Sequence, residues 1–216
     1  MDSAMIERSV GRDARLLPLA RMLARVRKHE RIPASERRLA IRARLIESYG
    51  ETSLRVVETK IGWIGLAWSA RGLVTLQLPK STRAAAVRTL QREYPQGVWR
   101  EDASPEMLRE IREYAEGRRR AFELPLDWSS IKPFQRAVLK ATSTIPFGET
   151  RSYGWVAHKI GKPRASRAVG HALATNPIPI ILPCHRVIGS DGGLHGYGGG
   201  LPMKAMLLKL EGAVLT

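Results

Sequence analysis

Cysteine is nearly absent from this chain: Cys184 is the only one among 216 residues. A single cysteine excludes an internal disulfide, and no C-x-x-C pair is present to hold a structural metal, so no metal site is expected. No apolar run approaches the roughly 20 residues of a membrane helix. Charges interrupt the N-terminus where a signal peptide needs an apolar stretch. These absences favour an intracellular, cytoplasmic protein with no membrane segment.

Acidic residues are also few. The chain has 20 acids against 36 lysines and arginines, a formal net charge of +16. Residues 1–50 carry 12 bases and 6 acids (net +6), residues 51–128 carry 13 and 11 (net +2), and residues 129–216 carry 11 and 3 (net +8). A basic field of this size is typical of proteins that contact phosphate backbones, although solubility alone is the simpler interpretation.

Three segments differ in pattern and define the expected domains. Residues 1–50 are arginine-rich with leucines at helical spacing, which predicts a basic helical N-terminal extension. Residues 51–128 combine β-rich stretches, typical of a hairpin or meander, with helical ones, which predicts a small α/β scaffolding domain. Residues 129–216 are mainly helical, with glycine and proline turns. After residue 50, three helices are expected first, at about residues 82–94, 104–116 and 133–143.

The third segment also contains a candidate DNA-binding motif. A short helix capped by Ser152 is joined by a glycine and proline turn to a second helix over residues 165–176, an arrangement typical of a helix-turn-helix. Small residues, among them Ala165 and Ala168, line the second helix, and Arg167 is its long charged side chain. Small side chains let a backbone approach a surface closely, although a closely packed core helix would have the same pattern.

The stretch PCHRVIGSDGGLHGYGGG, residues 183–200, holds the single cysteine between Pro183 and His185. A thiol reacts as its thiolate, whose pKa falls near a histidine or positive charge. Neighbouring residues point apart in an extended segment, so a water bridging Cys184 and His185 is the better arrangement. The preceding PIPIIL is expected to be a buried strand. A lone cysteine is often only a small buried hydrophobe, but a glycine loop beside it would let a substrate approach.

These residues resemble the active-site signature of the O6-alkylguanine-DNA alkyltransferases, the methylated-DNA–protein-cysteine methyltransferases. PCHRVIG lies between NPIPIIL and GYGGG, and IPFGETRSYG, RAVGHALATNPIP and a C-terminal K-x-x-x-L-L-x-x-E-G also resemble the family, in order. The similarity covers residues 131–212. Residues 51–128 are similar only in type, and residues 1–50 have no counterpart.

The resemblance implies a fold and an activity. The fold is α/β: a small N-terminal α/β (RNase H-like) domain, and a C-terminal helical domain over residues 129–216 with a winged helix-turn-helix-like DNA-binding motif. Such proteins flip O6-alkylguanine out of double-stranded DNA and transfer the alkyl group irreversibly and stoichiometrically to a cysteine. The resemblance further implies no cofactor, contact through the minor groove and a monomer in solution.

The resemblance assigns catalytic roles by position. Cys184 matches the nucleophile, and His185 resembles the base that removes its proton through a water molecule. Glu211 resembles the carboxylate that orients the imidazole. Asn176 is similar to the hinge that joins the recognition helix to the active-site strand through hydrogen bonds.

Further positions are matched to DNA and to the flipped base. Arg167 resembles the arginine that fills the vacated base position, and Tyr153 the tyrosine that promotes rotation of the target nucleotide. Ala165 and Ala168 belong to the helix face that approaches DNA. The remaining pocket residues implied by the resemblance are Tyr197 as a wall, Lys204 as a positioning lysine, and Pro183.

Two departures and two alternatives stay open. Gly198 stands where some members have a hydroxyl, and Met206 where an aromatic is common. One alternative is a non-catalytic alkyltransferase-like damage sensor or DNA-binding regulator, but such sensors replace the nucleophile that Cys184 retains. Another is a thiol hydrolase using Cys184 and His185. It is disfavoured because adjacent residues seldom form a direct pair and a hydrolase has no use for the Arg167 helix.

Overall fold

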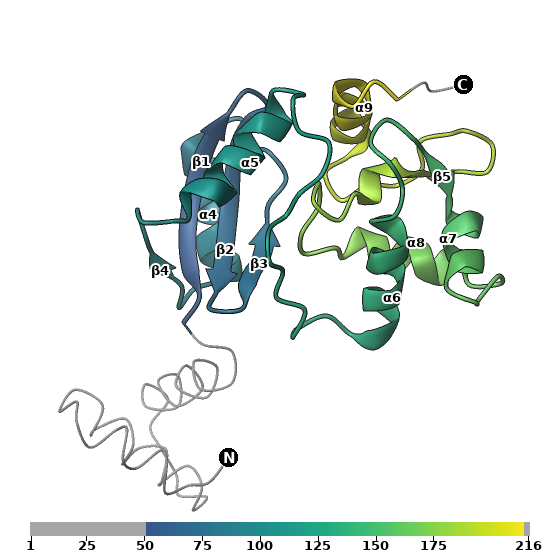
Figure 1. Cartoon of the computed structure of the whole chain (residues 1–216), viewed down its shortest axis with the longest axis horizontal. Coiled ribbons are helices and arrows are strands. Elements are labelled where there is room, and N and C mark those ends of the chain that lie inside the picture. The colour runs from purple at the N-terminus through teal and green to yellow at the C-terminus, as the bar shows by residue number, and fades with distance from the viewer. Residues whose placement is uncertain (1–50, 214–216) are drawn as a thin grey trace, which may run out of the picture. The chain divides into compact units, whose positions relative to one another are not determined.

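A computed structural model describes residues 51–213, coloured in Figure 1. The described residues from Thr52 onward form one compact unit. The basic helical extension expected for residues 1–50 lies outside the described residues. The domain boundary expected at residues 128/129 stays a prediction.

The N-terminal part of the described chain is a twisted sheet. Its strands are β1 (Ser53–Thr59), β2 (Gly62–Ser69), β3 (Gly72–Leu76) and β4 (Val98–Trp99), in the order β3-β2-β1-β4. Neighbours among the first three run antiparallel, and β4 runs parallel to β1. The predicted hairpin or meander is therefore confirmed. Glycine is needed at position 72, where φ is +128° and a Cβ would lie 2.3 Å from the Pro125 carbonyl oxygen.

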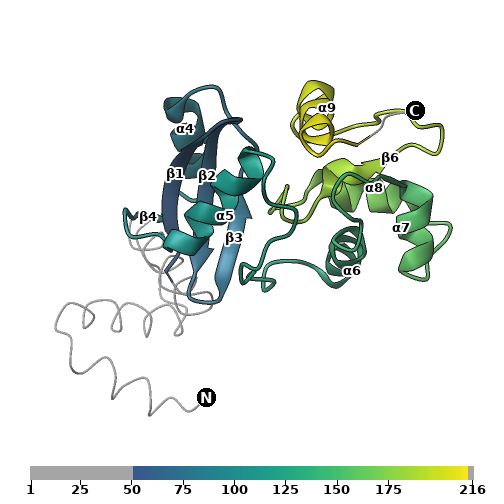
Figure 2. The same cartoon turned by 45° about the horizontal axis from the view of Figure 1, so that its top comes forward.

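Two helices cover opposite faces of this sheet, as Figure 2 shows: α4 (Arg83–Glu93) behind it and α5 (Pro105–Ala115) in front. Alternate residues of a strand point to opposite faces. Leu66 of β2 accordingly belongs to the core cluster that includes α5, whereas Ala67 packs with Leu90 of α4. Both helices begin close to the expected starts, and the side chains of Thr82 and Ser104 cap them by accepting backbone hydrogen bonds.

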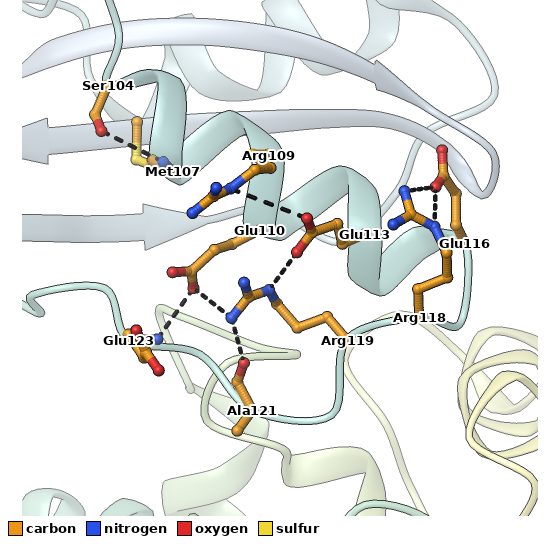
Figure 3. Close-up of polar contacts among 10 residues, drawn as sticks. All are labelled: Ser104, Met107, Arg109, Glu110, Glu113, Glu116, Arg118, Arg119, Ala121 and Glu123. Carbon is orange, nitrogen blue, oxygen red and sulfur yellow. Dashed lines mark hydrogen bonds and ion pairs between the residues drawn. The ribbon is translucent and has the colours of Figure 1, made fainter.

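A charged cluster ties α5 to the chain that follows it (Figure 3). Arg119 donates to Glu113 at 2.8 Å and lies 3.5 Å from a carboxylate oxygen of the buried Glu110. Glu110 in turn accepts the backbone N–H of Glu123 at 3.0 Å. These contacts fasten the segment that follows α5 to the helix itself.

The C-terminal part is mainly helical. Its elements are α6 (Pro133–Thr142), β5 (Arg151–Ser152), α7 (Tyr153–Lys159), α8 (Ser166–Ala174), the 3-10 turn η1 (Cys184–Arg186), β6 (Val187–Ile188) and α9 (Leu201–Leu210). The side chain of Ser152 caps α7 by accepting the Trp155 N–H at 3.1 Å. The predicted pair of helices joined by a glycine and proline turn is confirmed, with Gly161 in the left-handed region at φ +70°.

The strand expected for PIPIIL is wrong. Residues 177–182 form turns rather than a strand. The expected burial is present, since Ile178, Ile180 and Leu182 are all in the core. Prolines interleave them, however, and a proline has no N–H to donate to a sheet ladder. Ile180 also has a φ of +75°, which a β-branched residue rarely adopts and which a strand excludes.

The larger hydrophobic cluster of the described residues joins the sheet to the helical part. It includes Leu76 of β3, Ile111 of α5, Leu139 of α6 and Leu207 of α9. The backbone N–H of Leu76 donates to the carbonyl of Pro177 at 3.1 Å, so the sheet contacts the turns that lead to the cysteine. Between residues 51 and 213, no helix is long and apolar enough to cross a membrane.

Candidate active site

Cys184 begins the 3-10 turn η1, directly after the buried turns of residues 177–182. It is 7% exposed, so its thiol is almost enclosed. Burial raises the pKa of this thiol, whereas the side chains of Asn176 and Tyr197 and the charge of Lys204 act to lower it. The resting group is therefore mainly a thiol, surrounded by groups that stabilise a thiolate once the proton leaves.

His185 is fully buried beside the cysteine and pairs with Glu211. Its Nε2 lies 2.7 Å from Glu211 Oε1, across 26 positions of sequence. Its Nδ1 is buried without a hydrogen-bond partner among the described residues. Burial lowers the pKa of His185, opposed by Glu211 and assisted by the charges of Arg186 and Lys204. A neutral imidazole that donates from Nε2 to Glu211 presents Nδ1 as a proton acceptor.

Glu211, the C-cap residue of α9, is 4% exposed and surrounded by donors. Arg186 donates to both of its oxygens, at 2.7 and 3.0 Å. The Tyr114 hydroxyl donates to Oε1 at 2.8 Å, and the Gly148 N–H to Oε2 at 3.4 Å. Burial alone would raise the pKa of Glu211, but hydrogen bonds and charges from His185 and Arg186 lower it to about 2. The carboxylate is thus a fixed anion.

Asn176 follows α8 and fastens the turns that lead to the cysteine. Its Nδ2 donates to the Leu182 carbonyl at 2.7 Å, and its Oδ1 accepts the Ile178 N–H at 3.0 Å. Both contacts are of the kind expected for a hinge between the second helix and the active-site segment. The partner is an irregular segment rather than the expected strand.

Lys204 and two tyrosines surround the glycine-rich loop. Lys204 is fully buried and donates to the carbonyls of Val187 at 2.7 Å and His195 at 3.0 Å, and burial lowers its pKa to about 8. Tyr153, the first residue of α7, points its hydroxyl toward the Gly196 carbonyl at 3.5 Å. The hydroxyl of Tyr197 is buried and has no partner within the geometric limits of a hydrogen bond among residues 51–213. The Tyr197 side chain acts to lower the pKa of the Cys184 thiol.

The residues expected to meet DNA lie on and before α8. Arg167 and Ala168 are exposed, and Ala165 is the half-buried N-cap residue. Gly170 faces the Tyr153 ring, where a Cβ would lie 3.7 Å from the nearest ring atom. A Cβ at this position would make only an ordinary van der Waals contact with the ring, so the space there does not require a glycine. Pro183, which precedes the cysteine, is buried.

Sequence reasoning missed three residues that organise this site. Arg186 directly follows His185 in sequence, and it donates to both oxygens of Glu211. Tyr114 comes from α5, far from the motif, and no local signal points to it. Gln135 of α6 donates to the Ala172 and Thr175 carbonyls at 3.1 and 2.9 Å and so fixes the end of α8. Residues 51–213 contain no cluster of three His, Cys, Asp or Glu side chains suited to a metal.

The depressed pKa of Glu211 predicts an acid-sensitive fold. Its folded pKa of about 2 lies below the ordinary 4.5, so its contribution to stability is complete above pH 4.5 and is lost as pH falls toward 2. The loss should approach about 3 kcal/mol. Urea unfolding at several pH values should show this slope in the wild type and a flatter one in Glu211→Gln. Asp127, whose pKa is also lowered to about 2, contributes to the same slope, so Asp127→Asn should flatten it separately and the double variant should flatten it further. Equal slopes for Glu211→Gln and wild type would contradict the assignment.

Comparison with known proteins places this geometry in a family. Residues 133–213 match the sequence model described as 6-O-methylguanine DNA methyltransferase, DNA binding domain. The methylated-DNA–protein-cysteine methyltransferase of Methanosarcina barkeri is 45% identical over 158 residues, which are 72% of this chain and 94% of that protein. That of Mycolicibacterium paratuberculosis is 43% identical, over 73% of this chain and 90% of its own.

Solved structures of similar proteins have the same fold. The Mycobacterium tuberculosis OGT in complex with DNA is 40% identical, with a TM-score of 0.64 over 74% of this chain and 92% of that one. The O6-methylguanine-DNA methyltransferase of Pyrococcus kodakaraensis is 26% identical, with a TM-score of 0.55 over 75% of this chain and 99% of that one. The expected α/β fold with a C-terminal helical part is confirmed. The chain belongs to the methylated-DNA–protein-cysteine methyltransferase family.

Proposed function

We propose that this protein repairs DNA by direct reversal, moving the alkyl group of an O6-alkylguanine to Cys184 in a single turnover. The observation that carries the proposal is the arrangement of the one cysteine: nearly enclosed, and next to a buried His185 paired with Glu211 at 2.7 Å. The named relatives are methyltransferases whose acceptor is a protein cysteine.

The reaction requires one proton transfer and one substitution. The thiol proton passes through a water molecule to Nδ1 of His185, while Nε2 keeps its hydrogen bond to Glu211. The thiolate sulfur then attacks the alkyl carbon, so that an S–C bond forms as the C–O6 bond breaks. The electron pair of that bond goes to the guanine, which takes up one proton and is restored. The thioether formed is stable, so each molecule reacts once.

Groups around Cys184 support the thiolate during this step. Because burial raises the thiol pKa, the anion must be stabilised locally, and Asn176, Tyr197 and Lys204 all act in that direction. We assign Tyr197 and Pro183 to the wall of the pocket that receives the flipped base. Lys204 holds the loop that lies over it, through the Val187 and His195 carbonyls.

DNA is the partner of this protein, and the helix pair α7–α8 is its proposed contact surface. We assign α8 to the minor groove, where Ala165 and Ala168 permit close approach and the exposed Arg167 fills the position that the alkylated guanine leaves. Tyr153 would press on the target's phosphate. Extruding a base costs a few kcal/mol, which such contacts can offset.

Intact mass provides the test of this function. The full chain is incubated with a duplex oligonucleotide containing one O6-methylguanine, and we expect its mass to rise by one methyl group and no further. Peptide mapping should place the methyl group on Cys184, and the same duplex with ordinary guanine serves as the control. Tight binding with an unchanged mass would contradict the transferase and favour a damage sensor.

A further inference from the structure

We propose that Tyr114, contributed by the sheet-covering helix α5, is a positioning residue for the His185–Glu211 pair. Its hydroxyl donates to Glu211 Oε1 at 2.8 Å, and the same oxygen pairs with His185 Nε2 at 2.7 Å. Tyr114 and Glu211 are 97 positions apart and are 1% and 4% exposed, so water does not compete for this contact. The inference rests on the proposed function and adds the α/β part of the chain to its active-site machinery.

Ring packing and the ion pairs of α5 hold the Tyr114 hydroxyl in place. The Tyr114 ring packs against Phe122 and Phe147, with ring centroids 5.5 and 6.4 Å away. The helix that carries it is fastened by Arg119, which joins Glu113 and Glu110 (Figure 3). A phenol with so little freedom can only donate toward Glu211. Burial and the nearby Glu211 raise the Tyr114 pKa strongly, so the hydroxyl keeps its proton.

The contact has a consequence for proton transfer. A hydrogen bond to a carboxylate draws negative charge toward the donor. Tyr114 therefore reduces the negative charge on Glu211 Oε1. With less charge beside it, the protonated imidazolium form of His185 is stabilised less. The other charged groups that act on His185 are Arg186 and Lys204, and both lower its pKa. Together with these groups, Tyr114 keeps the imidazole of His185 neutral and able to accept the thiol proton.

Tyr114→Phe tests this with the least change of shape. Single-turnover transfer from an O6-methylguanine duplex to the full chain is measured across a range of pH. We expect the rate near neutral pH to fall roughly tenfold, since a hydrogen bond to a charged group is lost. We also expect the acid limb of the rate profile to move to higher pH, because His185 becomes easier to protonate.

Tyr94→Phe is the matched control. Tyr94 also has a largely buried hydroxyl, hydrogen-bonded to Thr75, but it packs with the other face of the sheet. Its removal should leave both the rate and the acid limb unchanged. If Tyr114→Phe behaves like Tyr94→Phe, the inference is wrong. A lowered melting temperature and a slower rate with an unmoved acid limb would make Tyr114 merely structural and would also overturn it.

A second substitution keeps the test open if Tyr114→Phe does not fold. A fluorinated tyrosine placed at position 114 alone keeps the hydroxyl and makes it a stronger donor. It should move the acid limb in the opposite direction, to lower pH, and an unmoved limb would count against the inference. Failure of the wild type itself to accept a methyl group would instead refute the proposed function, so the two failures are distinguishable.

Discussion

Cys184→Ser is expected to bind alkylated DNA and to accept no alkyl group at all. A serine alcohol loses its proton far less readily than a thiol. Burial raises the pKa even of the Cys184 thiol despite the neighbouring groups that lower it, so the same groups cannot ionise an alcohol. The substitution also replaces sulfur by a smaller atom in an almost enclosed position, so folding should be little affected. Intact mass after incubation with the O6-methylguanine duplex measures transfer, and a gel-shift titration measures binding.

Two features make this experiment decisive. The chain has no other cysteine, so no second thiol can replace the first. The wild type and the variant can also be compared on the same duplex with ordinary guanine, which separates general DNA affinity from recognition of the lesion. Any alkyl adduct on Cys184→Ser, or an adduct on another residue of the wild type, would refute the assigned nucleophile.

Arg167→Ala should slow repair of duplex DNA and largely spare transfer from free O6-alkylguanine. Only the duplex requires a base to leave the stack, at a cost of a few kcal/mol, and Arg167 is the exposed long side chain proposed to fill the gap. Losing that compensation should lower the duplex rate roughly 10- to 100-fold. Single-turnover rates on the two substrates, taken side by side, measure the effect.

Arg88→Ala is the control for charge. Arg88 is an exposed arginine of α4, on the far side of the sheet from α5, and its removal lowers the net charge by the same amount. It should leave the ratio of the two rates near its wild-type value. Equal losses on duplex and free base in Arg167→Ala would assign Arg167 to folding or to the pocket instead of to base extrusion.

The sequence by itself determined the features that depend on neighbouring residues. Helix starts follow from short-range hydrogen bonds: Ser152 accepts a backbone N–H three positions ahead, as predicted, and Thr82 and Ser104 do the same near the expected starts of their helices. The cysteine and its histidine are adjacent, and the order of motifs around them was sufficient to identify the family. Such features are local, because a few residues and their dihedral angles decide them.

Only the tertiary structure decided which distant groups meet at the cysteine. The apolar, β-branched residues 177–182 predicted a strand, but prolines without N–H groups and the fold around Asn176 produced buried turns instead. Arg186 and Tyr114 lie on different elements, and the packing of α5 and η1 against the end of α9 brings both to Glu211. A buried carboxylate must be satisfied by whichever donors the fold supplies, and sequence spacing does not reveal a contact made across 97 positions.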